Sequence, residues 1–145
     1  MNYKYWLKPK LERLEDRRAA LQNIPDQIRA LECAFGGIRA AKTDGDPVSG
    51  GTNHREDALI DNITEREKLQ QDLEATRLEV ETMDKAIAKL EEKERRVLDL
   101  AYIHKQRGYI ERLAEEFGCD TSTIYRLRRQ AEVRLCIILC GGAGL

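Results

Sequence analysis

The sequence predicts an all-α protein in which a long antiparallel helical hairpin, coiled-coil-like, precedes a C-terminal helix–turn–helix domain. Two observations favour this class. Apolar residues recur at helical spacing along most of the 145 residues, and the composition is 35% charged with only 6% aromatic residues and three prolines. Such a composition suits long solvated helices, while 41% hydrophobic residues suffice for a core. We expect one domain at 1–90 and a second at 91–145.

The first long helix is expected from residue 3 to about residue 38. From Leu21 onward its apolar residues are spaced 3, 4, 3, 4 and 3 apart, which is a heptad seam. Pro25 interrupts the seam, and a proline inside a helix removes a hydrogen bond and clashes with the preceding turn. We therefore expect a kink or a break near Asn23, and the continued register favours a kink. The apolar track consists of Leu7, Leu11, Leu14, Leu21, Ile24, Ile28, Leu31, Phe35 and Ile38.

A glycine-rich linker is expected at about 37–53, starting at Gly36-Gly37. Asn53 can cap the next helix, and Glu56 three residues later can complete a capping box. That second helix is expected from about His54 to Leu90. Its apolar seam consists of Leu59, Ile63, Leu69, Leu73, Val80, Met83, Ile87 and Leu90, with Thr76 in one further seam position.

Each of these two helices would be about 50 Å long at ~1.5 Å per residue. Their similar length and the linker between them predict an antiparallel hairpin with facing seams. A two-helix hairpin buries little, so we expect a homo-oligomer that pairs through the N-terminal helices. The hairpin could instead be a dedicated surface for a second protein, and the linker could be a plain loop or a contact site.

The segment 110–129 fits the spacing of a helix–turn–helix. A short apolar-faced helix precedes it, and the turn 105–108 separates the two. Within the segment, Ala114 provides a small residue where the second helix crosses the first, and Gly118 provides a residue that tolerates positive φ in the turn. Asp120 or Thr121 can cap the second helix. The residues expected to face the shared core are Ile110, Leu113, Phe117, Cys119, Ile124, Leu127 and Ala131.

The exposed face of that second helix predicts contact with double-stranded DNA, because a recognition helix enters the major groove by its N-terminal residues. The candidates for reading base edges are Ser122, Tyr125, Arg126 and Arg129, and the candidates for phosphate contacts are Thr121, Thr123, Arg112 and Arg128. An arginine in such a place can grip guanine O6 and N7 in bidentate fashion. Residues 95–134 hold nine basic and six acidic residues, a balance of 9 − 6 = +3 in a chain of net charge −1.

The segments ERRVLDLAYI and RLAEEFGCDTSTIYRLRRQAEVRL are similar to region 4 of sigma-70 factors, the part that reads the promoter's −35 element. The whole chain resembles small sigma-like proteins of phages and integrated elements in Gram-positive bacteria, which place a coiled-coil hairpin before such a domain and are similar to late-gene activators. The segment TDGDPVSGGTNHRED fits that type. No segment resembles the region that melts the −10 element, so the resemblance implies a DNA-binding regulator rather than a complete sigma factor.

The function expected from these features is sequence-specific duplex DNA binding and transcription regulation, as a homodimer with recognition helices about one helical turn of DNA apart, or a multiple of it. One alternative is an interaction protein that binds RNA polymerase or another factor without reading DNA. Another is an assembly component similar to a phage terminase small subunit. The position of the DNA-binding domain at the end of the chain disfavours that alternative.

No enzyme activity, cofactor or metal is expected. The sequence lacks a nucleophile–base pair, a phosphate loop and metal-ligand spacing, and its two histidines lie in different segments. The four cysteines form no CxxC pair and are expected to be buried free thiols, with a metal or a disulfide as the alternative. The start MNYKYWLKPK lacks the apolar core of a signal peptide, and no stretch approaches the ~20 apolar residues of a membrane span. We expect a cytoplasmic protein with no membrane partner. The run from Leu135 to Cys140 is expected to extend the last helix and pack on the domain, with contact to a partner chain as the alternative.

Overall fold

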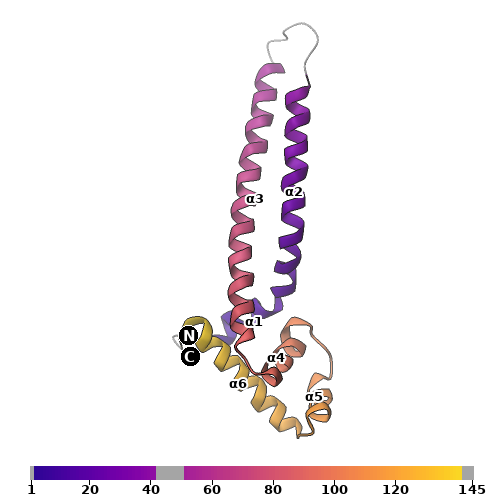
Figure 1. Cartoon of the computed structure of the whole chain (residues 1–145), viewed down its shortest axis with the longest axis vertical. Helices are drawn as coiled ribbons and strands as arrows, with labels where there is room; N and C mark the ends of the chain where they lie inside the picture. Colours follow the sequence, from indigo (N-terminus) through magenta and orange to yellow (C-terminus); the bar gives the residue numbers. More distant parts are fainter. Residues whose placement is uncertain (1, 42–50, 142–145) are drawn as a thin grey trace. The chain divides into compact units, whose positions relative to one another are not determined.

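The computed structural model describes residues 2–41 and 51–141, and the regular structure within these ranges is entirely helical, as predicted (Figure 1). The chain forms two compact units. We call residues Arg18–Leu78 the hairpin unit, and Met1–Arg17 together with Glu79–Leu145 the terminal unit. The elements are α1 (Tyr3–Glu12), α2 (Leu14–Ala40), α3 (Gly51–Ala88), α4 (Glu92–Leu98), the π-helix η1 (Asp99–Ile103), α5 (Tyr109–Phe117) and α6 (Thr121–Cys140).

The expected first helix is two helices, and the break lies at Arg13 rather than near Asn23. Pro25 lies inside α2, which continues through it with one missing hydrogen-bond donor. The interruption at Arg13 separates Leu7 and Leu11 from the heptad seam. Both leucines are fully buried in the terminal unit, where α1 contacts η1 and α6. Burial of these two side chains gives a physical reason for the break.

The helix boundaries next to the expected linker also differ from the prediction. The pair Gly36-Gly37 lies within α2, which ends at Ala40. The second long helix begins at Gly51, so Asn53 lies inside α3 and is not its N-cap. The rest of the expected linker, 42–50, lies outside the described residues.

In the hairpin unit, helices α2 and α3 run side by side in opposite directions (Figure 1). The amide of Asn62 donates a 2.8 Å hydrogen bond to the carbonyl oxygen of Leu31, and Asn62 is only 6% exposed. The expectation that Ile63 lies in the seam is wrong, since it is 39% exposed. The guanidinium of Arg66 donates to the Asn62 side-chain oxygen at 2.9 Å and lies 4.9 Å from the Phe35 ring centroid. The seam of α3 therefore contains a polar layer.

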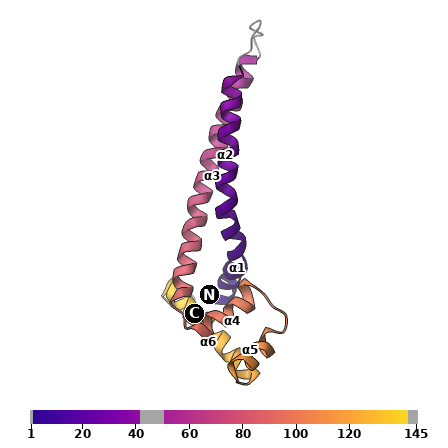
Figure 2. The same ribbon diagram turned by 45° about the vertical axis from the view of Figure 1, so that its right-hand side comes forward.

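The terminal unit is built around the packing of α4 against α6 (Figure 2). Helix α4 starts with a capping box in which the fully buried Glu94 accepts from the Glu91 backbone N–H. The same Glu94 carboxylate accepts a 2.8 Å hydrogen bond from Arg134 of α6, so a buried charge is paired. Helix α6 extends to Cys140, and Leu135 and Cys136 are completely buried. The expectation that Leu135 to Cys140 extends the last helix and packs on the domain is confirmed; for the glycine-rich tail that follows, which was expected to do the same, residues 142–145 lie outside the described residues.

The cysteines are free thiols, but their expected burial holds only in part. Cys136 is buried and Cys119 half-buried, whereas Cys33 and Cys140 are exposed. Cys33 lies within α2, in the hairpin unit. None of the helices in the described ranges combines the length and the apolar character needed to cross a membrane.

Candidate nucleic-acid interface

Helices α5 and α6 are joined by a three-residue turn, residues 118–120. Gly118 adopts φ +63°, the left-handed conformation that the sequence predicted for it. The backbone N–H of Cys119 donates to the carbonyl oxygen of Ala114 at 2.9 Å and closes the end of α5. Asp120 occupies the N-cap of α6, and its carbonyl oxygen accepts from the Thr123 N–H at 3.0 Å. The turn is therefore fixed by backbone hydrogen bonds at both of its ends.

An apolar core holds the two helices against the end of α4 and against η1. Its buried residues are Val97, Leu100, Ile110, Leu113, Ala114 and Ile124, with Tyr109, Phe117, Cys119 and Leu127 packed at the edge. Ala131, one turn further along α6, is also completely buried. The residues that the sequence placed on the core side of the two helices are thus buried or half-buried.

The predicted contact residues on α6 fall into one exposed group and one exception. Six of the seven are exposed and lie within the first nine residues of the helix: Thr121, Ser122, Thr123, Tyr125, Arg126 and Arg129. The aromatic ring of Tyr125 is prominent, since the residue is 51% exposed. The fold therefore brings hydroxyl groups, one aromatic ring and two guanidinium groups together on one end of α6.

Arg128 is the exception, because it is half-buried and engaged by neighbouring side chains. Its Nη1 donates a 2.6 Å hydrogen bond to the hydroxyl of Tyr109, and its guanidinium lies 5.4 Å from the Tyr125 ring centroid. Its Nε lies 3.8 Å from a carboxylate oxygen of Glu132. The eighth predicted residue, Arg112 on α5, is exposed and donates to the side chain of Gln106.

The sequence reasoning missed a polar cluster around Glu132, which is 3% exposed. The hydroxyls of Tyr3 and Tyr102 both donate to its carboxylate. Burial, followed by the hydrogen bond to Glu132 and its negative charge, raises the pKa of Tyr102 above its ordinary value. Glu132 lies next to Ala131 on the buried arc of α6 and four residues after Arg128, so helical spacing could have indicated it. No local pattern places Tyr3 there, since it is 129 residues away in the chain.

A shallow groove continues the exposed face of α6 beyond the predicted contact residues. Val133 and Ile137 form its apolar floor, and Ile137 is 46% exposed. Arg126, Arg129 and Arg134 border it. The groove thus combines an apolar strip with three cationic groups along the same helix.

Within the described residues, no group of three or more histidine, cysteine or acidic side chains is arranged to hold a metal ion. The candidate interface itself offers hydroxyl, aromatic and guanidinium groups.

The fold and the site define an all-α protein whose terminal unit presents the cationic face of one helix after a tight turn. A model of DUF1492, a family of proteins of unknown function, matches residues 38–136, and the chain belongs to this family. The match covers α3 to α5 and most of α6, and it leaves out α1. No curated protein and no solved structure matches the chain.

Proposed function

We propose that this protein binds double-stranded DNA sequence-specifically through α6 and regulates transcription. The observation that carries the proposal is the exposed group on the first nine residues of α6, presented by the turn at Gly118. Such a helix fits the major groove of B-DNA, with its N-terminal residues toward the base edges. The resemblance of this segment to region 4 of sigma-70 factors supports the same use.

The side chains in this group have separate roles in the proposal. Arg126 and Arg129 read guanine edges, each worth about 1–3 kcal/mol of discrimination. Thr121 and Thr123 contact phosphate oxygens and set the register of the helix on the duplex. Arg128 reaches a phosphate only if it leaves Tyr109 and Glu132, so it contributes less than the two exposed arginines.

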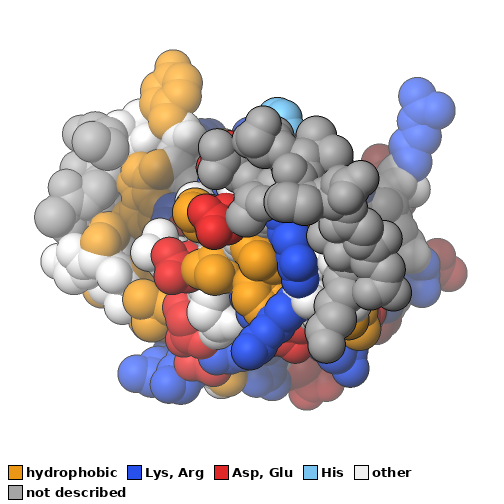
Figure 3. All heavy atoms as spheres, turned by 90° about the horizontal axis from the view of Figure 1, so that it is seen from above, with side chains coloured by type: hydrophobic (Ala, Val, Ile, Leu, Met, Phe, Trp, Pro, Cys, Tyr) orange, Lys and Arg blue, Asp and Glu red, His pale blue; other side chains and the backbone are white. Residues whose placement is uncertain are grey.

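The proposed DNA-binding form is a homodimer paired through the hairpin unit. The seam residues of α2 in this unit are only half-buried, and Ile60 and Ile63 of α3 are 59% and 39% exposed. Figure 3, which views the molecule from above, shows hydrophobic side chains among charged ones of both signs on that face. A second hairpin packed on these residues would bury apolar surface that one hairpin leaves in water.

Binding-site selection from random duplex DNA, followed by fluorescence anisotropy on the selected site, tests the proposal. We expect Arg126→Ala and Arg129→Ala each to weaken binding to the selected site by about tenfold or more, because each removes a bidentate contact. Arg77→Ala is the matched control, since it removes an exposed arginine from α3. Equal binding by all three variants, or no enrichment of any sequence, would contradict the proposal.

The groove on α6 favours a second candidate function, in which the same unit binds a protein such as RNA polymerase. An acidic partner helix with apolar anchors would complement Val133 and Ile137 together with Arg126 and Arg129, since Arg134 is already paired with Glu94. Ile137→Ser separates the two functions, because it lies outside the proposed DNA-contact group. If it abolishes capture of purified polymerase while DNA binding is unchanged, the groove is a protein-binding surface.

A further inference from the structure

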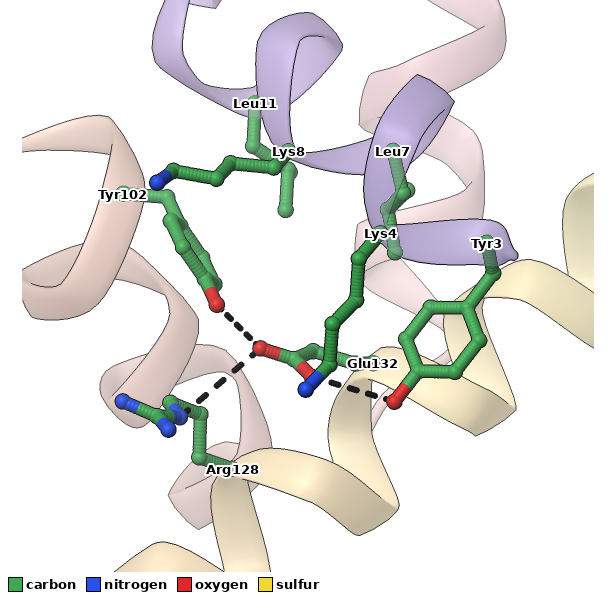
Figure 4. A pocket seen from close by; sticks show the side chains of 8 residues that line it. All are labelled: Tyr3, Lys4, Leu7, Lys8, Leu11, Tyr102, Arg128 and Glu132. Atoms are coloured by element: carbon green, nitrogen blue, oxygen red, sulfur yellow. Dashed lines mark hydrogen bonds and ion pairs between the residues drawn. The ribbon is translucent and has the colours of Figure 1, made fainter.

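A cavity of about 300 Å³ lies within the terminal unit, between α1, η1 and α6 (Figure 4). This volume is at the lower end of the range typical of small-molecule sites. Leu7 and Leu11 of α1 lie behind its wall and are completely buried, so its accessible apolar surface belongs to the stems of Lys4 and Lys8 and to the tyrosine rings. The hydroxyls of Tyr3 and Tyr102 point toward Glu132 from opposite sides. The cavity is thus amphipathic, with lysine stems and tyrosine rings around a polar base.

The polar lining of the cavity has an excess of positive charge. Three cations, Lys4, Lys8 and Arg128, line it together with one acid, Glu132, a balance of 3 − 1 = +2. The single acid is already engaged, since two tyrosine hydroxyls donate to it and Arg128 lies within ion-pair distance. A cationic ligand would therefore find no available carboxylate and would meet three like charges.

The two lysines lack a strong partner, and Arg128, which donates to the hydroxyl of Tyr109, leaves one of its nitrogens without a hydrogen bond. The Nε of Arg128 is buried and makes no hydrogen bond, because Glu132 at 3.8 Å is too distant to accept one. A buried donor without a partner is costly, so the guanidinium of Arg128 is not fully satisfied where it stands. Lys8 has only an exposed pair with Glu12 at 3.6 Å, and within the described residues Lys4 makes no ion pair.

We propose that this cavity binds a small organic anion, with a phosphate or carboxylate head at Arg128, Lys4 and Lys8. The apolar part of the ligand lies against the stems of Lys4 and Lys8 and the ring of Tyr3. The phenol oxygens of Tyr3 and Tyr102 donate their hydrogens to Glu132, so they remain acceptors for a ligand hydroxyl. This assignment makes α1 a wall of the binding site.

Occupancy of the cavity would act on α6, a consequence that rests on the proposed function. Arg128 and Glu132 lie on the same helix as Arg126 and Arg129. An anion that holds the guanidinium of Arg128 in the cavity prevents it from reaching a DNA phosphate. We expect saturation with the anion to weaken DNA binding, so the ligand would be a negative effector.

The test is titration of the full chain, without DNA, with phenyl phosphate, which joins a phosphate head to a compact apolar ring. Inorganic phosphate serves as the head alone, and benzyl alcohol serves as a neutral probe of similar size. Calorimetry gives affinity and stoichiometry for each probe. We expect 1:1 binding of phenyl phosphate, with inorganic phosphate and benzyl alcohol both weaker.

The double variant Lys4→Gln/Lys8→Gln removes two charges from the cavity. We expect it to weaken phenyl phosphate binding by about tenfold or more, since charge-assisted hydrogen bonds are lost. The matched control, Lys10→Gln/Lys89→Gln, removes two charges outside the lining and should bind as the unmodified chain does. The proposal is overturned by equal loss in both double variants or by benzyl alcohol binding as tightly as phenyl phosphate. Absence of saturable binding at millimolar concentration overturns it as well. Because no DNA is present, failure of the proposed DNA binding would leave this result unaffected.

Discussion

The side-chain amide of Asn62 in α3 donates a 2.8 Å hydrogen bond to the backbone carbonyl oxygen of Leu31 in α2. Asn62 occupies a position of the heptad seam where an apolar residue would bury more hydrophobic surface. A buried asparagine at such a position specifies helix register and association state at a cost in stability. We therefore expect this pair to set the alignment of the two helices in the hairpin unit.

Replacing Asn62 with alanine removes that hydrogen bond and leaves a small void in the seam. We expect Asn62→Ala to lower the free energy of unfolding by about 1–2 kcal/mol. Urea denaturation followed by circular dichroism measures the change. Asn23→Ala is the control on the exposed side of α2 and should alter the free energy by less than about 0.5 kcal/mol.

Replacing Asn62 with leucine completes the apolar seam and removes the register signal. We expect Asn62→Leu to raise the melting temperature and to populate more than one association state, because apolar seams tolerate several alignments. Light scattering after size exclusion measures the molar mass. A more stable protein with a single unchanged mass would show that Asn62 does not select the alignment.

Gly118 tests the strain in the turn between α5 and α6. An alanine there would meet no heavy atom within 4 Å, so the cost of Gly118→Ala comes from φ +63° alone. We expect a loss of about 1–2 kcal/mol in the free energy of unfolding. Gly37→Ala offers the opposite case, since this glycine lies inside α2 with open space around it. Gly37→Ala should raise the free energy of unfolding by about 0.5–1 kcal/mol. If Gly37→Ala lowered it more than Gly118→Ala does, the left-handed conformation at Gly118 would not be the source of the cost.

Tyr102 links the stability of the terminal unit to alkaline pH. Its folded-state pKa is raised above the ordinary 10.0 by burial and by Glu132. Because the folded pKa is the higher one, its contribution to stability is complete below about pH 10 and is lost as pH rises through the folded value. Urea midpoints measured from neutral to alkaline pH should therefore fall more steeply for the unmodified chain than for Tyr102→Phe.

At neutral pH, Tyr102→Phe should be less stable by about 2 kcal/mol, because a hydrogen bond to a charged group is lost. Tyr5→Phe is the control, since Tyr5 is 81% exposed. Parallel pH profiles of the unmodified chain and Tyr102→Phe would show that Tyr102 does not carry the dependence.

Local patterns predicted much of the fold. Helical periodicity predicted the all-α class, and the spacing of Ala114 and Gly118 predicted the turn whose positive φ the structure has. The seam assignment was wrong at Ile63. Choosing the nearest apolar residue places Ile63 in the seam, whereas the regular 3, 4 spacing that continues from Leu59 places Asn62 there, and Asn62 is the buried residue.

The parts that depend on long-range packing could not be predicted from the sequence. The heptad register runs from Leu7 to Leu14 without a signal for the break at Arg13, which follows from burial of α1 against η1 and α6. The cavity around Glu132 joins Tyr3 to residues near the other end of the chain. Helical spacing alone predicts Arg128 on the exposed face of α6, in contact with a DNA phosphate. In the structure its guanidinium is instead engaged by Tyr109 and Glu132, which helical spacing does not predict.

The salt dependence of DNA binding tests most directly whether α6 contacts DNA. Neutralising phosphates releases counterions, so log Kobs for a selected duplex should fall linearly with log salt, with a slope of about −0.9 per phosphate contacted. Thr121 and Thr123 are neutral, so the slope of the unmodified chain reports its cationic contacts. We predict a steep negative slope for the unmodified chain and for Arg77→Ala. The slope should be shallower by about one for Arg112→Ala, which removes the exposed arginine predicted at a phosphate. Arg126→Ala and Arg129→Ala should instead weaken binding to the selected duplex, because each removes a base contact. A flat salt dependence, or identical affinities and slopes for all of these chains, would contradict DNA recognition by α6.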